Sequence, residues 1–269
     1  MTTNYHTAIT TGAAANASVV NSPLSELDSA IAAIVAGAQQ SHYDLSINLP
    51  GLASFFTMAS VTQAGLPIDE TGNLIPVSNG DPTFETTTQG QSYIALDGTG
   101  DYLSRNDSSD SYFPGTESFM ETNGATFIMW VYPESVTGTQ NILSKWTAGA
   151  QEGYLFNLSG TTLQSFISDD GSTTFTGATG TVAINTWQRL VFRFTPSVSL
   201  DVFVNTTKST VTAAVPASIH NSTAQIQIGA SAGTDLLTGR ISSLRFYRTA
   251  LSDTILDSLY TASRTRYGV

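Results

Sequence analysis

The sequence predicts a mainly β protein, an antiparallel sandwich or barrel preceded by an N-terminal arm and one short α-helix. Three observations predict this fold class. Short runs rich in β-branched and aromatic residues recur from about residue 43 onward, turn signals separate them, and almost no helical pattern lies between them. The chain of 269 residues accommodates one large β domain plus an appendage, and its 41% hydrophobic content supplies a packed core.

The N-terminal segment differs in character from the rest. Residues 1–21 are small and polar, and we interpret them as an arm that is ordered only when something holds it. A helix of about 15 residues is predicted next, because Ser22 suits its N-cap and Pro23 its first position. Its apolar positions recur at helical spacing, and they are Leu24, Leu27, Ile31 and Ile34.

Two interpretations of this apolar stripe stay open. The helix packs on its own globular domain, or identical helices pair with each other as a short oligomeric seam. We divide the chain into 1–43, an arm with an oligomerising or anchoring helix, and 44–269, the β domain.

The candidate strands of the β domain are Ala53–Met58, Tyr93–Leu96, Ala125–Tyr132, Ile142–Trp146, Tyr154–Leu158, Thr162–Ser168, Trp187–Phe194, Ser199–Asn205, Gln225–Gly229 and Gly239–Arg248. Both faces of Ala125–Tyr132 are apolar, which predicts a central strand covered on both sides. Turns are predicted at Asp97–Gly100, at Asp169–Gly171 and at Gly177–Gly180. One later helix is predicted over Ser252–Tyr260, with Ser252 as its cap.

The composition excludes several classes of function. The formal net charge is −11, from 10 Lys and Arg against 21 Asp and Glu, so the cationic footprint that nucleic-acid binding needs is missing. The chain has no cysteine, which excludes disulfides, thiolate nucleophiles and cysteine-type zinc sites. Its first residues do not resemble a signal peptide, and no apolar run approaches the ~18 residues that span a bilayer. We expect no membrane insertion.

Five segments of the β region, in order and with family-like gaps, resemble the concanavalin A-like, laminin-G-like jelly-roll family. They are Ser92–Leu103, Ala125–Pro133 followed by Asn141–Trp146, Asn185–Gln188, Val202–Asn205 and Gly239–Ser252. The resemblance covers about residues 48 to 262 and implies a concanavalin A-like antiparallel β-sandwich. One departure is Thr206, which stands where the family has glycine, so we expect that hairpin turn to differ. This fold serves lectins, adhesins, glycanases and spacers alike.

The sequence argues against an enzyme. Glycanases of this sandwich class use two carboxylates on one strand, and no predicted strand carries two acidic residues at alternating positions. The segment Gly229–Gly233 has the G-x-S-x-G spelling of a hydrolase elbow. That elbow leads into a helix, whereas Thr234–Gly239 leads into a predicted strand, so we interpret the segment as a turn.

A bound calcium ion is one hypothesis for the acidic loop region that contains Asp97 and Asp101. Hard cations require several oxygen ligands. The resemblance also implies this site, because related jelly rolls often hold calcium near the sandwich rim. The alternative is that Asp97 and Gly98 simply close a turn. No other cofactor is expected.

Sugar binding is the commonest use of the family, and it places an aromatic ring against a sugar face beside amide or carboxylate groups. The candidates on exposed loops are Trp146 with Lys145, and Tyr112 with Phe113. The alternative for each is a place in the core. Trp130 and Trp187 are expected in the core.

The segment from Tyr5 through Asp28 is similar to the openings of tailed-phage fibre, spike and appendage proteins. This resemblance implies a structural protein on the virion surface, assembled in the host cytoplasm, which presents a lectin-like sandwich to a host-surface glycan. It also implies a homo-oligomer, with a trimer favoured, that joins other virion proteins through its arm. The alternative is a free carbohydrate-binding module or a cell-surface adhesin unconnected to a virion.

Overall fold

The computed structural model describes residues 52–61, 67–69, 76–107 and 124–269. The chain divides into two units, Met1–Leu45 and Ser46–Val269, and every described residue lies in the second. The predicted arm and its helix therefore lie outside the described residues, and so do the predicted oligomerisation positions Leu24, Leu27, Ile31 and Ile34. Within the described ranges, no helix is long and apolar enough to cross a membrane.

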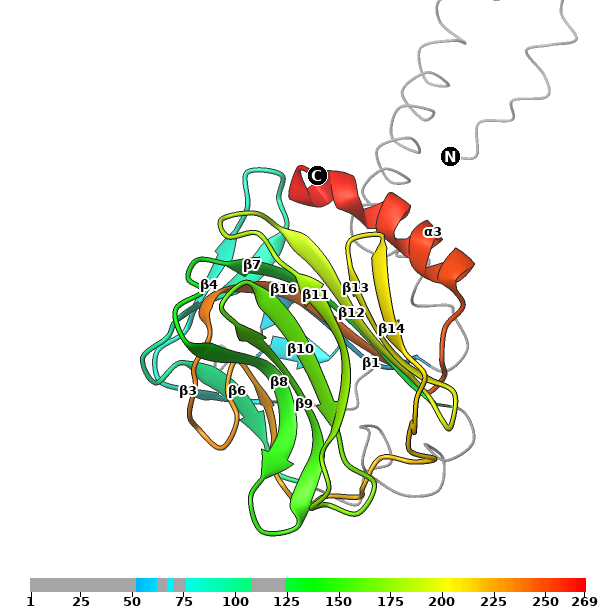
Figure 1. The fold of residues 1–269 in the computed structure, drawn as a ribbon. Coiled ribbons are helices and arrows are strands. Elements are labelled where there is room, and N and C mark those ends of the chain that lie inside the picture. Colours follow the sequence, from blue (N-terminus) through cyan, green and yellow to red (C-terminus); the bar gives the residue numbers. More distant parts are fainter. Residues whose placement is uncertain (1–51, 62–66, 70–75, 108–123) are drawn as a thin grey trace, which may run out of the picture. The chain divides into compact units, whose positions relative to one another are not determined.

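Two antiparallel sheets packed face to face make up the described fold (Figure 1). The larger sheet has nine described strands in the order β14-β13-β12-β7-β16-β1-β2, with β5 beside β16 and β4 beside β5. Their bounds are β1 Leu52–Val61, β2 Pro67–Asp69, β4 Thr83–Thr86, β5 Ser92–Asp97, β7 Ala125–Pro133, β12 Gln188–Thr195, β13 Ser199–Val204, β14 Thr207–Val211 and β16 Thr238–Tyr247.

The smaller sheet has seven described strands in the order β11-β10-β9-β8-β15-β6-β3. Their bounds are β3 Val77–Asn79, β6 Tyr102–Arg105, β8 Thr139–Thr147, β9 Gln151–Ser159, β10 Thr162–Ile167, β11 Phe175–Thr181 and β15 Ile226–Ile228. The chain crosses repeatedly between the two sheets, and the result is the antiparallel jelly-roll sandwich that the sequence predicts.

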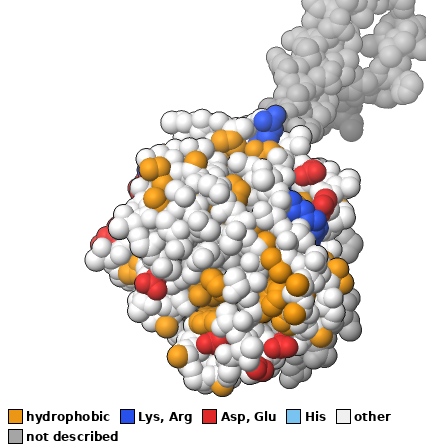
Figure 2. All heavy atoms as spheres, in the orientation of Figure 1, with side chains coloured by type: hydrophobic (Ala, Val, Ile, Leu, Met, Phe, Trp, Pro, Cys, Tyr) orange, Lys and Arg blue, Asp and Glu red, His pale blue; other side chains and the backbone are white. Residues whose placement is uncertain are grey.

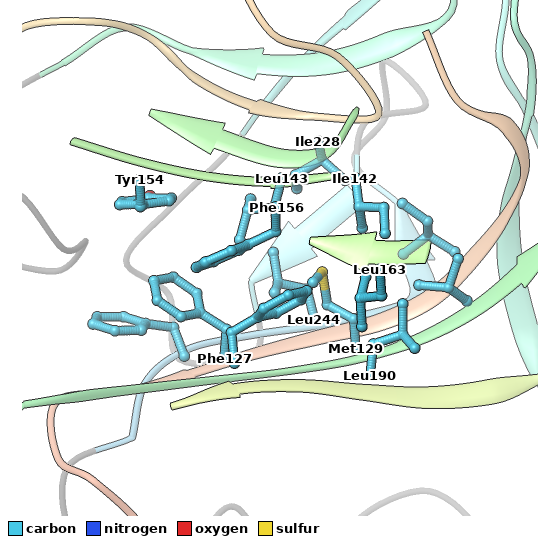
Figure 3. Close-up of a cluster of buried hydrophobic side chains, with 14 of the residues drawn as sticks. Phe127, Met129, Ile142, Leu143, Tyr154, Phe156, Leu163, Leu190, Ile228 and Leu244 are labelled. Carbon is cyan, nitrogen blue, oxygen red and sulfur yellow. The ribbon is translucent and has the colours of Figure 1, made fainter. Parts of the chain in front are cut away.

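Strand β7 has the central place predicted for it, between β12 and β16. Its alternation explains this, because Phe127 and Met129 point into the space between the sheets whereas Ile128 and Trp130 point to the opposite face. Figure 3 shows Phe127 and Met129 meeting side chains of the smaller sheet such as Phe156. The Phe127 and Phe156 rings lie 5.1 Å apart edge to face, an arrangement that adds to the stabilisation from burial.

The outer face of the nine-stranded sheet is covered by the C-terminal elements, α3 (Asp253–Ser263) and the 3-10 helix η2 (Arg264–Tyr267) (Figure 1). Helix α3 begins as predicted, with Ser252 in extended conformation accepting a hydrogen bond from the Ile255 amide. One apolar cluster under these elements consists of Ile128, Val191, Phe203, Tyr247, Leu251, Leu256 and Leu259. A second consists of Tyr93, Trp130, Trp187 and Tyr267, so Trp130 and Trp187 are buried as expected.

The predicted turn at Gly177–Gly180 is wrong, because these residues lie within strand β11. A Cβ at Gly177 would overlap the Leu200 side chain of β13, and a Cβ at Gly180 would lie 2.9 Å from Cγ2 of Val204. The two glycines therefore let β11, the edge strand of the smaller sheet, approach β13 of the larger sheet. The structure also contains five further strands that the sequence pattern does not predict, and they are β2, β3, β4, β6 and β14.

The hairpin that departs from the family pattern at Thr206 is a two-residue turn, because Val204 pairs with Thr207. Asn205 supplies the left-handed conformation at φ 57°, which asparagine tolerates better than other non-glycine residues. Its side-chain oxygen also accepts a hydrogen bond from the Arg189 amide at 3.0 Å. A second residue with positive φ is therefore not required at Thr206.

Candidate functional site

The outer face of the seven-stranded sheet carries almost no charge. The strand register aligns one row of outward side chains across it, and the row consists of Val77, Ser104, Gln227, Ser144, Leu155 and Phe166. Of the described strands in this sheet, only β9 carries an acidic residue, Glu152. Figure 2 looks onto the side of β9, β10 and β11 and shows charged side chains only in small separate groups.

A loop between β15 and β16 crosses this face. The Ser144 hydroxyl donates to the Ala230 carbonyl at 2.9 Å, and the Gly233 amide donates to Oε1 of Gln227 at 3.0 Å. The turn interpretation of Gly229–Gly233 is confirmed, because no helix follows it. Ser231 donates its hydroxyl to the Trp146 carbonyl at 3.3 Å, which is structural pairing and not the geometry of a nucleophile.

Beside this loop lies a pocket of about 480 Å³, a volume in the range of small-ligand sites. Its described lining consists of Val77, Asn79, Ser104, Arg105, Asn106, Asp107 and Gln225. We call it the amide pocket. It joins the ends of β3 and β6 to the residue that precedes β15, so three segments far apart in the sequence supply its walls.

Hydrogen bonds hold the amide side chains in place. Nδ2 of Asn79 donates to Oγ of Ser104 at 2.9 Å, and Nε2 of Gln225 donates to Oδ1 of Asn106 at 2.6 Å. Nε2 of Gln227 donates to Oε1 of Gln225 at 3.2 Å, which continues the chain of amides toward the loop. These contacts restrict the side chains to defined rotamers, so a ligand meets groups that are already oriented.

Two charged residues, Arg105 and Asp107, belong to the described lining of the amide pocket, and Asp107 is held in an ion pair. Lys145 Nζ lies 2.7 Å from Oδ1 of Asp107 and donates to the Ala224 carbonyl at 3.0 Å. Burial lowers the pKa of Lys145, and the hydrogen bond and charge of Asp107 partly oppose that shift. Asp107 itself lines the pocket, and its side chain is 25% exposed.

The structure corrects the expected position of Lys145. The sequence places it on an exposed loop, but it lies in β8 with 0% exposure, paired with Tyr154 and Ile226. Both of these partners face the core, so Lys145 points inward and reaches the pocket only through Asp107. It contacts Asp107 and is not among the described residues that line the pocket.

Trp146 lies at the opposite face of the same strand and is partly exposed. Gln225, one wall of the amide pocket, directly precedes β15, the strand that pairs with β8, but Trp146 is not among the described residues that line the pocket. The second predicted sugar-binding pair, Tyr112 with Phe113, lies outside the described residues.

Sequence reasoning missed Asn79, Asn106 and Gln225, because isolated amides in a chain rich in Asn and Gln carry no local signal.

The described carboxylates of the predicted calcium region bind backbone amides. Asp97 Oδ1 accepts from the Thr99 amide at 2.6 Å and so closes the predicted turn. Asp101 Oδ1 accepts from the Asp81 amide at 2.8 Å, and its side chain is almost fully buried. No group of three metal-ligating side chains occurs among the residues that the structure describes, so Asp97 and Asp101 do not by themselves fit calcium. Calcium binding stays a prediction.

The arrangement also lacks the carboxylate pair of a glycanase within the described strands, because each of them carries at most one acidic residue. The two packed antiparallel sheets define a lectin-like β-sandwich. A family model described as the concanavalin A-like lectin/glucanases superfamily matches residues 97–255. The chain belongs to this family.

Solved structures with the same fold include receptor-binding domains. The botulinum neurotoxin serotype G binding domain is 13% identical with a TM-score of 0.61, covering 78% of this chain and 50% of that one. The binding domain of botulinum neurotoxin DC, solved with rat synaptotagmin II, is 10% identical with a TM-score of 0.61, covering 79% and 52%. This chain thus spans about half the length of those structures, and identities this low show the fold alone. The comparison with curated proteins found no match.

Proposed function

We propose that this chain is a non-enzymatic adhesion protein of a phage virion and that it binds a host-surface glycan in the amide pocket. The observation that carries the proposal is the convergence of three amides, the Asp107 carboxylate and the Arg105 guanidinium in a single concave site. Sugar hydroxyls both donate and accept hydrogen bonds, and an amide side chain offers both functions.

Two further features of the site support a glycan. Val77 is 56% exposed and supplies an apolar contact for the C–H face of a sugar ring, and Trp146 lies one strand away. The net charge of −11 disfavours strongly anionic polymers.

The similar toxin domains point to the same class of ligand. One was solved in complex with sialylT, and another is described in connection with cell entry dependent on two ganglioside molecules. Those ligands belong to proteins of which this chain matches about half, so they support the class of ligand and not its identity.

The test is a glycan array with the full chain, followed by the same array with Asn106→Ala and Gln225→Ala. We expect binding to a defined set of glycans and a loss of about tenfold in apparent affinity in each variant, because a bound sugar loses one or two hydrogen bonds. Gln164→Ala is the matched control, since this amide lies on β10 of the same sheet and does not line the pocket. An array without hits, or equal binding by all four proteins, would refute the glycan proposal.

The virion role is tested separately by the solution mass of the full chain and of a version that begins at residue 44. We expect an oligomer, with a trimer favoured, that becomes monomeric when residues 1–43 are removed. This result would support assembly through the predicted Leu24–Ile34 seam. Monomers in both cases, together with glycan binding, would favour a free carbohydrate-binding module.

A further inference from the structure

A second and larger cleft lies on the opposite side of the sandwich from the strand edge β3. Its volume is about 800 Å³. The cleft runs between β11, the edge strand of the seven-stranded sheet, and β14, the edge strand of the nine-stranded sheet. We call it the hydroxyl cleft. It shares no lining residue with the amide pocket.

The lining of this cleft has an unusual composition. Six threonine and serine residues line it, and they are Thr162, Thr179, Thr181, Thr206, Thr207 and Ser209. None of the six makes a side-chain hydrogen bond with a described residue, so all of them retain both donor and acceptor capacity. The amides of Asn205 and Gln188 and the ring of Tyr260 complete the polar lining. No charged residue contributes to the described walls.

The cleft has rigid walls. The glycines of β11 bring that strand against Leu200 and Val204 of β13, which sets the separation of the two sheets at the cleft floor. Tyr260 is held by Arg189, whose guanidinium lies 4.9 Å from the centre of the tyrosine ring, and by stacking against Trp130 at 6.0 Å. Its position is therefore set before a ligand arrives, and its ring is partly exposed at the cleft.

We infer that the hydroxyl cleft is a second saccharide site, specific for a neutral oligosaccharide. A charged ligand would find no counter-charge among the described walls, and an apolar ligand would leave six hydroxyls without water or partners. A neutral sugar chain avoids both problems. It carries no charge, its own hydroxyls pair with those of the walls, and one of its rings packs against Tyr260. This inference concerns a separate site, so it stands or falls independently of the amide pocket.

The test uses the full chain and a panel of four neutral probes, which are maltotriose, cellotriose, mannotriose and chitotriose. Saturation-transfer NMR identifies a bound probe, and calorimetry then measures its affinity. We expect at least one probe to bind, and the double variant Thr181→Val/Thr207→Val to bind it about tenfold more weakly because one hydroxyl is lost from each wall. Valine keeps the shape and the strand preference of threonine, so folding is preserved.

Thr210→Val is the matched control, because this exposed threonine lies on β14 but does not line the cleft. Asn106→Ala distinguishes the two sites, and it should bind the neutral probe normally. The inference is overturned if no probe binds, or if the double variant binds the probe as well as Thr210→Val does. It is also overturned if Asn106→Ala loses affinity for the probe while the double variant keeps it. Unchanged melting temperatures exclude unfolding as the cause of any loss.

Discussion

Arg193 and Asp201 face each other on the neighbouring strands β12 and β13, and the guanidinium donates twice to one carboxylate oxygen. Nε lies 2.8 Å and Nη2 2.7 Å from Oδ2 of Asp201, which is 0% exposed. Nη1 of the same arginine donates to the Leu251 carbonyl and to Asp253, both at 2.6 Å. One buried cation thus joins the nine-stranded sheet to the start of helix α3.

Arg193→Met should therefore lower the free energy of unfolding by about 3–5 kcal/mol, because Asp201 is left buried without its cation. Urea denaturation measures the change. Arg240→Met is the comparison, since Arg240 pairs with Glu134 where both side chains are about one-third exposed, and we expect a loss of about 1 kcal/mol or less. Equal losses in the two variants would contradict the role assigned to burial.

Lys145 and Asp107 should show coupled effects on stability. Lys145→Met leaves Asp107 and the Ala224 carbonyl without their donor, and we expect a loss of about 1–3 kcal/mol, moderated because Asp107 is 25% exposed to water. Adding Asp107→Asn should restore part of that loss. A double-mutant cycle by thermal denaturation measures the coupling, and strictly additive effects would show that the pair does not interact.

The pH dependence of stability should include a contribution from Asp253. Burial alone would raise the pKa of this carboxyl, but hydrogen bonds from Arg193 and Lys208 outweigh burial and hold the pKa below its ordinary value of 3.8. Its contribution is therefore complete above about pH 4 and is lost as the pH falls through the lower, folded-state pKa. Asp253→Asn should be less stable than the parent at pH 7, with the difference shrinking toward pH 2.

Chemical denaturation at a series of pH values measures this effect. Asp169→Asn serves as the control, because this exposed aspartate makes no side-chain hydrogen bond to the described residues. A constant difference between Asp253→Asn and the parent from pH 7 to pH 2 would rule out the proposed linkage.

Gly177→Ala should destabilise the sandwich by about 1–3 kcal/mol, because the added methyl group overlaps Leu200 across the two sheets. Leu200→Ala removes one of the two side chains that the methyl group would meet, the other being Ser165, so the double variant should be more stable than the sum of the two single losses predicts. Differential scanning calorimetry measures all three proteins. A neutral Gly177→Ala variant would show that β11 and β13 move apart at little cost.

The central part of the fold is predictable because its strands carry a local pattern. Ala125–Tyr132 alternates with apolar residues on both faces, and a strand with two apolar faces has to be covered twice. The cap at Ser252 is equally local, because the serine and the apolar positions after it identify the helix start. By contrast, β11 contains two glycines that resemble a turn, and only the contact with β13 explains them.

The candidate sites are less predictable than the fold, because they depend on which strands become neighbours. Asn79, Asn106 and Gln225 come from three separated segments and meet only through the pairing of β3, β6 and β15. Lys145 shows the converse case. Its charge favours a surface position, but the strand register turns it inward, where Asp107 compensates the charge.

The placement of the basic residues has a practical consequence for protease mapping. Of the 10 lysines and arginines, Lys145, Arg189, Arg193 and Arg245 are buried, and none occurs before Arg105. Trypsin therefore has no cleavage site in the first 104 residues, whatever their conformation. Elastase, which cuts after small aliphatic residues, is the suitable reagent to compare the N-terminal segment in free and assembled protein, and resistance to trypsin alone reports nothing about it.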